Sequence, residues 1–286
     1  MMTQTVTLLT DWGLADHYAA VVRARLQAKL PDVRVVDISH AVPRDNSNIY
    51  AAAYMLFDTY RYFPTGTIHI IGVDDIASPE NAHLVVKFDR QFFIGADNGF
   101  FSVLECLSGK QAEEVYEIKT WQETQVYTFP ARDLFPKVAT LLAVGTPIGQ
   151  IGTRLADKER FRPKLLEGGL VLQRTPEKDR NGNVTGMQLS GMVLCVDGFG
   201  NIITNITKKQ FAACEAEFKF AELRVDWRKF PGKFVKAYMD VEAGDIAFIF
   251  LENGFLEISM NRGNAARILG VDNGAKVVVR FEINKR

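Results

Sequence analysis

The chain has 286 residues, of which 47% are hydrophobic and 24% are charged, so its composition is that of a globular protein and excludes disordered and fibrous classes. Its 34 lysines and arginines balance its 34 aspartates and glutamates, which leaves no basic excess for general nucleic-acid binding. No signal-peptide pattern opens the chain and no apolar run approaches the ~20 residues of a membrane helix, so we expect a cytoplasmic, two-domain protein that engages neither nucleic acid nor membrane.

The first half of the chain alternates short apolar strands with amphipathic helices. Buried strands are predicted at Thr5–Thr10, Val33–Ile38 and Thr67–Val73. Apolar residues at helical spacing predict helices from Asp16, as the capping residue, to about Leu30, and at Asn48–Phe63, Phe100–Leu107 and Asp133–Val144. A hairpin is predicted where Asp89-Arg90 separates His83–Phe88 from Phe92–Gly95. This order indicates an N-terminal α/β domain over residues 1–165, with a mainly parallel sheet between helices.

The second half has short strands every eight to twelve residues, separated by Gly and Asn turns. The candidates are Gly169–Gln173, Gly186–Val196, Leu223–Val225, Ile246–Leu251, Phe255–Met260 and Lys276–Ile283. Arg160–Gly168 is expected to be a linker, and Thr175–Gly186 an exposed loop. The pattern predicts an all-β C-terminal domain over residues 166–286, a small antiparallel barrel.

Ionisable residues follow three strands of the first half. Asp11 follows the first strand, Asp37 and His40 end the second, and Asp74 and Asp75 end the third. In open α/β sheets ligands bind beyond the carboxyl ends of the strands, so this set is a candidate site. Aspartates at strand ends also commonly cap helices and shape turns, and both interpretations remain open here.

Several familiar motifs are missing from the sequence. There is no Gly-x-Gly-x-x-Gly after the first strand, no phosphate-binding P-loop and no Gly-x-Ser-x-Gly. The four histidines lack the spacing of a helical metal site, and the three cysteines form no Cys-x-x-Cys pair. These absences exclude the corresponding dinucleotide, nucleotide, α/β-hydrolase and zinc-site patterns.

Two polar stretches occur in the second half. Val196–Thr207 contains Asp197 and Asn201 on either side of Gly198 and Gly200, which permit tight turns. Leu251–Ala266 contains Asn253-Gly254, a hairpin signal, and then a loop rich in amides, Asn261–Asn264. Both stretches are consistent with ordinary β-turns. Clustered amides and exposed backbone are also what neutral groups such as adenine and ribose require.

Eight segments together resemble a known family. They are Thr7–Gly13 (TLLTDWG), Val36–His40 (VDISH), Phe63–Thr67 (FPTGT), Val73-Asp74, Ala96–Gly99 (ADNG), Thr128–Phe135 (TFPARDLF), Asp197–Asn205 and Asn253–Ala266. In this order and spacing they are similar to the S-adenosyl-L-methionine (SAM) hydroxide adenosyltransferases, relatives of the fluorinating and chlorinating enzymes. The resemblance runs along nearly the whole chain.

This resemblance implies an N-terminal α/β domain and a C-terminal β-barrel in a homotrimer, with SAM bound between the N-terminal domain of one subunit and the C-terminal domain of its neighbour. It implies hydrolysis of SAM to adenosine and methionine, with no metal and no cofactor. Asp74 matches a catalytic aspartate that binds ribose. The implied substrate-binding positions are Asp11, Asp197, Phe199, Asn201, Asn261, Arg262, Asn264 and Ala265.

The sequence departs from the family pattern at two catalytic positions. The arginine expected after Asp74 falls on or near Asn81, and the histidine of a Phe-His-Gly-Arg-Asp segment is Pro130. The serine of the halide site aligns with Ala131, which disfavours halogenation. Two hypotheses follow: a divergent SAM hydrolase, or a non-catalytic protein that binds SAM or adenosine. Adenosyl transfer to a different nucleophile is a third possibility.

Overall fold

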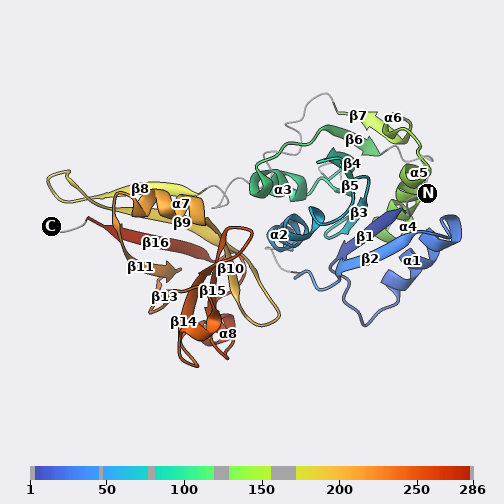
Figure 1. Ribbon diagram of the computed structural model, residues 1–286. Coiled ribbons are helices and arrows are strands. Elements are labelled where there is room, and N and C mark those ends of the chain that lie inside the picture. Colours follow the sequence, from blue (N-terminus) through green and yellow to red (C-terminus); the bar gives the residue numbers. More distant parts are fainter. Residues whose placement is uncertain (1–3, 45–47, 77–80, 119–128, 156–171, 284–286) are drawn as a thin grey trace. The chain divides into compact units, whose positions relative to one another are not determined.

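The computed structural model of the protein describes residues 4–44, 48–76, 81–118, 129–155 and 172–283. The chain divides into two compact units, Met1–Leu165 and Leu166–Arg286, which are each considered by themselves. Figure 1 labels their helices and strands. Within the described ranges, no helix combines the length and apolar character needed to cross a membrane. The predicted linker Arg160–Gly168 lies outside these ranges.

The N-terminal unit is built on a seven-stranded sheet in the order β2-β1-β3-β5-β4-β6-β7. Its strands are β1 (Thr5–Thr10), β2 (Arg34–Ser39), β3 (Ile68–Gly72), β4 (His83–Phe88), β5 (Gln91–Ala96), β6 (Glu114–Ile118) and β7 (Gly152–Arg154). The expectation of a mainly parallel sheet is wrong, because three of the six pairings are antiparallel. The predicted hairpin is the reason: Asp89 and Arg90 both take positive φ and turn β4 back against β5, and β6 and β7 continue that alternation.

Helices cover the N-terminal sheet on both faces (Figure 1). They are α1 (Tyr18–Lys29), α2 (Asn48–Tyr60), α3 (Phe100–Ser108), α4 (Pro130–Asp133), α5 (Phe135–Ala143) and α6 (Ile148–Ile151). Side chains of α1, α4 and α5 share one core with β1 and β3, whereas α2 and α3 pack against each other. Asp16 does not cap α1, which follows His17 without a side-chain cap. The helix predicted at Asp133–Val144 is confirmed as α5, whose first turn contains Pro136, and the short α4 before it was not predicted.

The C-terminal unit is a curled, mostly antiparallel nine-stranded sheet, so its predicted all-β class is confirmed. Its order is β12-β11-β16-β9-β10-β15-β14-β13, with β8 beside β9. This order has two ends, so the described strands form a half-barrel in place of the predicted barrel. The strands are β8 (Gln173–Lys178), β9 (Val184–Val196), β10 (Ile202–Thr207), β11 (Lys219–Val225), β12 (Arg228–Phe230), β13 (Lys233–Phe234), β14 (Ile246–Phe250), β15 (Phe255–Met260) and β16 (Lys276–Glu282).

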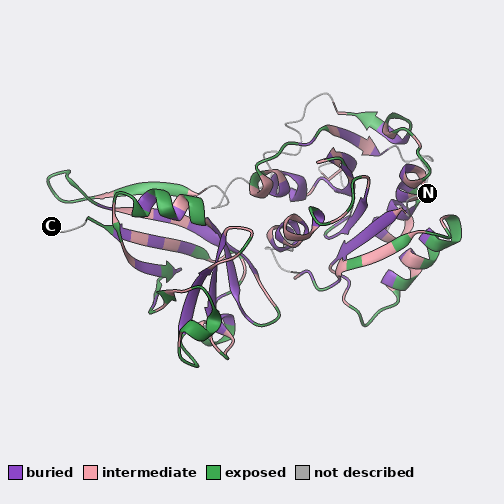
Figure 2. Cartoon of the chain, viewed as in Figure 1, coloured by how far each residue is buried: buried purple, intermediate pink, exposed green. Residues whose placement is uncertain are grey.

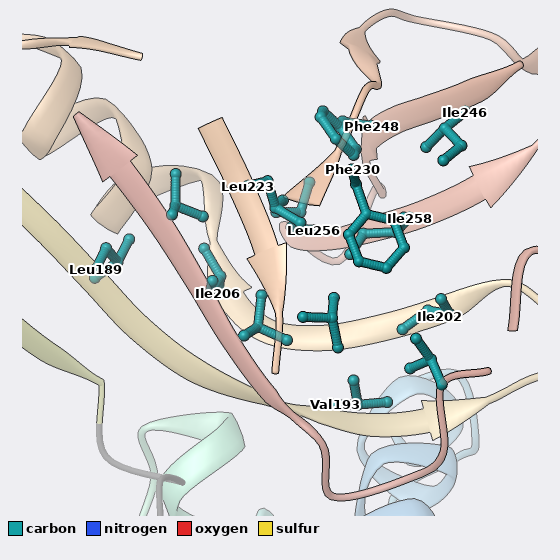
Figure 3. Close-up of a cluster of buried hydrophobic side chains, with 14 of the residues drawn as sticks. Leu189, Val193, Ile202, Ile206, Leu223, Phe230, Ile246, Phe248, Leu256 and Ile258 are labelled. Atoms are coloured by element: carbon teal, nitrogen blue, oxygen red, sulfur yellow. The ribbon is translucent and has the colours of Figure 1, made fainter. Parts of the chain in front are cut away.

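The curl of this sheet encloses one apolar core. Figure 3 shows Leu189, Val193 and Ile202 of β9 and β10 with Phe248 and Ile258 of β14 and β15 in the same interior. Burial alternates along β16, whose inward residues appear as separate bands in Figure 2. Two helices complete the unit, α7 (Lys208–Glu215) and α8 (Ala265–Leu269).

Several strand predictions in this unit need correction. Phe255–Met260 is confirmed as β15, and Asn253-Gly254 lies in the turn that precedes it. The predicted strand Gly169–Gln173 lies mostly outside the described residues, and β8 begins at its last residue. The predicted loop Thr175–Gly186 is shorter, because Thr175–Lys178 pairs with β9 as an exposed strand.

Candidate functional site

The carboxyl ends of β1 and β3 bring two predicted site residues together. These strands are parallel neighbours, with Thr10 opposite Gly72, so the residues that follow them emerge at one edge of the sheet. The backbone N–H of Asp74 donates to Oδ2 of Asp11 over 3.4 Å, and the N–H of Asp11 donates to the carbonyl of Gly72 over 3.3 Å. Asp11 and Asp74 therefore share the end of the parallel half of the sheet.

The surroundings of Asp11 act on its charge in opposite directions. Burial raises the pKa of the Asp11 carboxyl, while the Asp74 N–H and the nearby Arg44 guanidinium oppose that rise. Arg44 also donates from Nε to the Asp11 carbonyl oxygen over 2.7 Å. Asp11 is thus a half-buried carboxyl with one cation beside it.

Asp74 is exposed and sits in a left-handed turn. Its φ is +43°, a conformation that aspartate tolerates better than most residues. Nδ2 of Asn98 donates to the carbonyls of Val73 and Asp74, over 2.9 and 3.1 Å, and fixes the turn from the end of β5. The Asp74 side chain is therefore presented to solvent on a held backbone.

Asp75 points inward where Asp74 points outward. Its side chain is 8% exposed, and its Oδ2 accepts a hydrogen bond from the backbone N–H of Ala131 over 2.6 Å. Burial raises the pKa of this carboxyl from 3.8 to about 6, and the charges of Asp11 and Asp74 act in the same direction. The Asp75 carbonyl accepts from Nε2 of His83 over 2.9 Å, and that imidazole is itself buried against Phe135.

Residues at and just after the end of β2 contact the end of β1 and the loop that follows it. Asp37 forms an ion pair with Arg23 of α1, and Nε2 of His40 lies 3.3 Å from Asp37 Oδ1. Nδ1 of His40 is 2.7 Å from the Thr10 hydroxyl, and the ring stacks on Trp12. The His40 carbonyl accepts from the Gly13 N–H over 2.6 Å. Asp37 and His40 thus support the segment that carries Asp11.

An apolar wall stands beside the carboxylates. Pro130 and Ala131 are buried, and Phe129 packs edge-on against Trp12. A Cβ at Gly72 would lie 2.8 Å from the Ala131 Cβ and 2.9 Å from the Trp12 ring, so only glycine fits between them. This close approach fixes where the Ala131 backbone meets the end of β3.

The C-terminal unit has a pocket of about 860 Å³ that gathers most of the residues predicted there. Six of the seven C-terminal candidates line it: Asp197, Phe199, Asn201, Asn261, Arg262 and Asn264. The seventh, Ala265, is fully buried and begins α8 beneath the lining. Tyr238, from the short 3-10 turn Tyr238–Asp240, also lines the pocket, and nothing in the sequence pattern singled it out.

Several polar side chains of this pocket form hydrogen bonds within the loops that carry them. Asp197 accepts from the N–H groups of Phe199 and Asn201, over 2.9 and 2.8 Å, and from the Asn201 side chain over 3.0 Å. Asn264 caps α8 by accepting from the Arg267 N–H over 2.7 Å. The interpretation as turn residues therefore holds for these two side chains, and it is compatible with a place in the pocket wall.

Aromatic rings, backbone groups and the exposed Arg262 and Arg267 side chains are surfaces that this pocket offers to a ligand. The Phe199 ring is 80% exposed, and the Tyr238 ring lies in the same lining. Burial, followed by the charge of Glu257, raises the pKa of Tyr238 to about 12, so its phenol is neutral. Exposed aromatic faces with amide groups around them suit a flat neutral heterocycle, whereas the carboxylates of the other unit suit a cation.

Comparison with known proteins covers both units. Residues 6–152 match the family description SAM hydroxide adenosyltransferase N-terminal domain, and residues 191–278 match its C-terminal counterpart. A (R)-S-adenosyl-L-methionine hydrolase of Thermus thermophilus is 29% identical over 95% of this chain and 98% of that one. The hydrolase of Methanocaldococcus jannaschii is 28% identical over 93% and 92%. A fluorinase of Actinoplanes is 23% identical over 96% of each chain.

Solved structures agree with these matches. An uncharacterized conserved protein of Thermotoga maritima superimposes with a TM-score of 0.79 at 29% identity, over 96% of this chain and 99% of that one. A conserved hypothetical protein of Thermus thermophilus gives 0.70 at 27% identity, over 97% and 100%.

Proposed function

The chain belongs to the SAM hydroxide adenosyltransferase family, and on that footing we propose that it hydrolyses S-adenosyl-L-methionine to adenosine and methionine. The family resemblance inferred from the sequence is thereby confirmed. The relatives named as hydrolases match it from end to end and at higher identity than the fluorinase does. The sulfonium of SAM makes its ribose C5′ electrophilic, so the protein has to hold a nucleophile in line with the departing thioether.

The charge at the N-terminal edge supports a neutral nucleophile. Asp11 and Asp74 emerge together there, with Asp75 directly below. Carboxylates attract a sulfonium cation, by about 4 kcal/mol at 4 Å and an effective dielectric of 20, and repel an anion to a similar degree. These carboxylates would repel a halide anion as it approached, whereas they would not repel a neutral water molecule. This contrast is the observation that carries the proposal of hydrolysis over halogenation.

The proposed roles follow from these positions. Asp74, exposed on a held turn, contacts the ribose and the reacting groups as the catalytic residue, and Asp11 binds substrate beside it. The pocket lined by Asp197, Phe199 and Asn261 binds the adenine end through aromatic faces and backbone groups. We further propose that the protein is a homotrimer, as the sequence resemblance implies.

One alternative has a specific observation in its favour. Pro130 is buried and cannot accept or donate a side-chain proton, although the resemblance places a catalytic histidine there. A protein that binds SAM or adenosine without converting it would fit that loss.

Product analysis separates the two functions. We would incubate the protein with SAM, quantify adenosine and methionine by chromatography, and compare Asp74→Ala with Asp32→Asn, an exposed carboxylate on a turn after α1. Hydrolysis predicts equimolar adenosine and methionine from the wild type and Asp32→Asn, and a loss of product from Asp74→Ala. Saturable binding of SAM by calorimetry with no product would establish the binding protein instead.

A further inference from the structure

We propose that Asp75 is the general base of this reaction, the group that takes the proton from the attacking water. The inference rests on the proposed hydrolysis and adds a catalytic residue that the resemblance does not provide. It begins from the position of Asp75, which directly follows Asp74 and turns its side chain into the protein at the same edge.

The carboxyl of Asp75 is fixed by its neighbours. Its Oδ2 accepts the 2.6 Å hydrogen bond from the Ala131 N–H, and its own carbonyl accepts the 2.9 Å bond from His83. The close contact at Gly72 holds the Ala131 backbone against the end of β3. With one carboxyl oxygen anchored, the orientation of the Asp75 carboxyl is fixed, and general-base catalysis requires such a fixed orientation.

Three other ionisable groups near this edge are less suited to the task. The His40 imidazole is bonded to Thr10 through Nδ1 and covered by Trp12. The His83 imidazole is buried and donates its Nε2 proton to a backbone carbonyl. The Asp11 carboxyl already accepts the Asp74 N–H and has the Arg44 guanidinium beside it, and both oppose the rise in pKa that burial causes. The buried Asp75 carboxyl, by contrast, has two other carboxylates nearby. Among the described residues, no cation acts on it directly.

These surroundings set the basicity of Asp75. The groups that face it are Asp11 after β1, Asp74 beside it and His83 from β4, while Arg44 acts on Asp11. Burial first, and then the two carboxylates, raise its pKa to about 6. A base with a pKa just below neutral is mostly ionised at neutral pH and strong enough to accept a proton as the C–O bond forms.

The step balances without any further reactant. An O–H bond of water breaks and its proton passes to the Asp75 carboxylate, while the water oxygen donates an electron pair to C5′. The C5′–S bond breaks, its electron pair stays on sulfur, and the sulfonium becomes the neutral thioether of methionine. Asp75 then releases the proton to solvent. One SAM cation and one water give adenosine, methionine and one proton.

Rates of adenosine release as a function of pH test this assignment. We would measure kcat and KM for the wild type, Asp75→Asn and the control Asp32→Asn, with SAM affinity by calorimetry. For the wild type and the control, kcat should rise with pH, with its midpoint at about pH 6. Asp75→Asn should lower kcat by about 10²–10⁴-fold and abolish this rise, with affinity for SAM within a few-fold. Formate should restore part of the rate to Asp75→Ala.

The outcomes show whether the assignment of Asp75 as the base fails alone or together with the proposed hydrolysis. If Asp75→Asn keeps the wild-type kcat and its rise with pH, another group takes the proton and the assignment is overturned while hydrolysis stands. If the wild type binds SAM but releases no adenosine at any pH, both the hydrolysis and the base are overturned.

Discussion

Asp75→Asn should make the protein more stable at neutral and alkaline pH, even as it removes the proposed base. The folded protein holds this carboxyl with a pKa of about 6, against a usual value of 3.8, mainly because it is buried. A raised pKa means that the ionised form is disfavoured in the fold. Asparagine has nearly the same shape, and its side-chain oxygen can still accept the Ala131 N–H.

The size of the effect follows from the pKa. Each pKa unit corresponds to about 1.4 kcal/mol, so ionising Asp75 should cost the folded state about 3 kcal/mol. The carboxyl is 8% exposed, so solvent screening reduces this figure little. The stability that protonated Asp75 contributes is fully present below pH 3.8 and is lost as pH rises through about 6. The variant has no such loss.

Urea denaturation across pH 4 to 8 measures this difference. The free energy of unfolding of Asp75→Asn relative to wild type should grow from near zero at about pH 4 to about 3 kcal/mol at pH 8. Asp32→Asn, which changes an exposed aspartate, should follow the wild type across the range. A variant that is no more stable than wild type at pH 8 would refute the claim that burial raises the Asp75 pKa.

Three further outcomes are expected. Gly72→Ala should lower the free energy of unfolding by about 1–3 kcal/mol in thermal or urea melts, because its Cβ overlaps Ala131 and Trp12; wild-type stability would contradict the tight contact. Gly200→Ala should weaken SAM binding in calorimetry and destabilise the protein by at least about 1 kcal/mol, because φ is +85° and the new Cβ overlaps the Asn264 amide; unchanged affinity would separate this turn from the ligand. Light scattering should give about three times 32.1 kDa, and a mass of one subunit would exclude the homotrimer.

The strands that the sequence revealed are those whose pattern depends on local residues. Asn253-Gly254 between two apolar runs predicts β15 at its observed bounds. β10 escaped prediction because it carries polar residues that are buried. The Thr204 hydroxyl donates to the Leu256 carbonyl over 2.9 Å, and the Asn205 side chain accepts from the Met192 N–H over 2.7 Å. Partners on the two neighbouring strands, β15 and β9, satisfy these groups, and a local pattern cannot reveal them.

The candidate site also has some features that the local sequence predicts and others that depend on distant residues. The sequence predicted that Asp11 and Asp74 lie at one edge of the sheet, because this prediction requires only the positions at which the two parallel strands end. The sequence marked Asp75 as a strand-end carboxylate but not as a buried one. Its burial and its bond depend on Ala131, 56 residues further along the chain. The pair of consecutive aspartates was the available signal, and only the fold separates an outward Asp74 from an inward Asp75.

The carboxylates at the end of the parallel strands would also bind the substrate of the proposed reaction more tightly than its product. SAM carries a positive charge on sulfur, and the thioether of methionine carries none. An attraction of about 4 kcal/mol toward a cation at 4 Å disappears when that charge is lost. If the proposed reaction takes place, Asp11 and Asp74 would retain the substrate and release the product, and the protein would resist inhibition by methionine even where methionine is abundant.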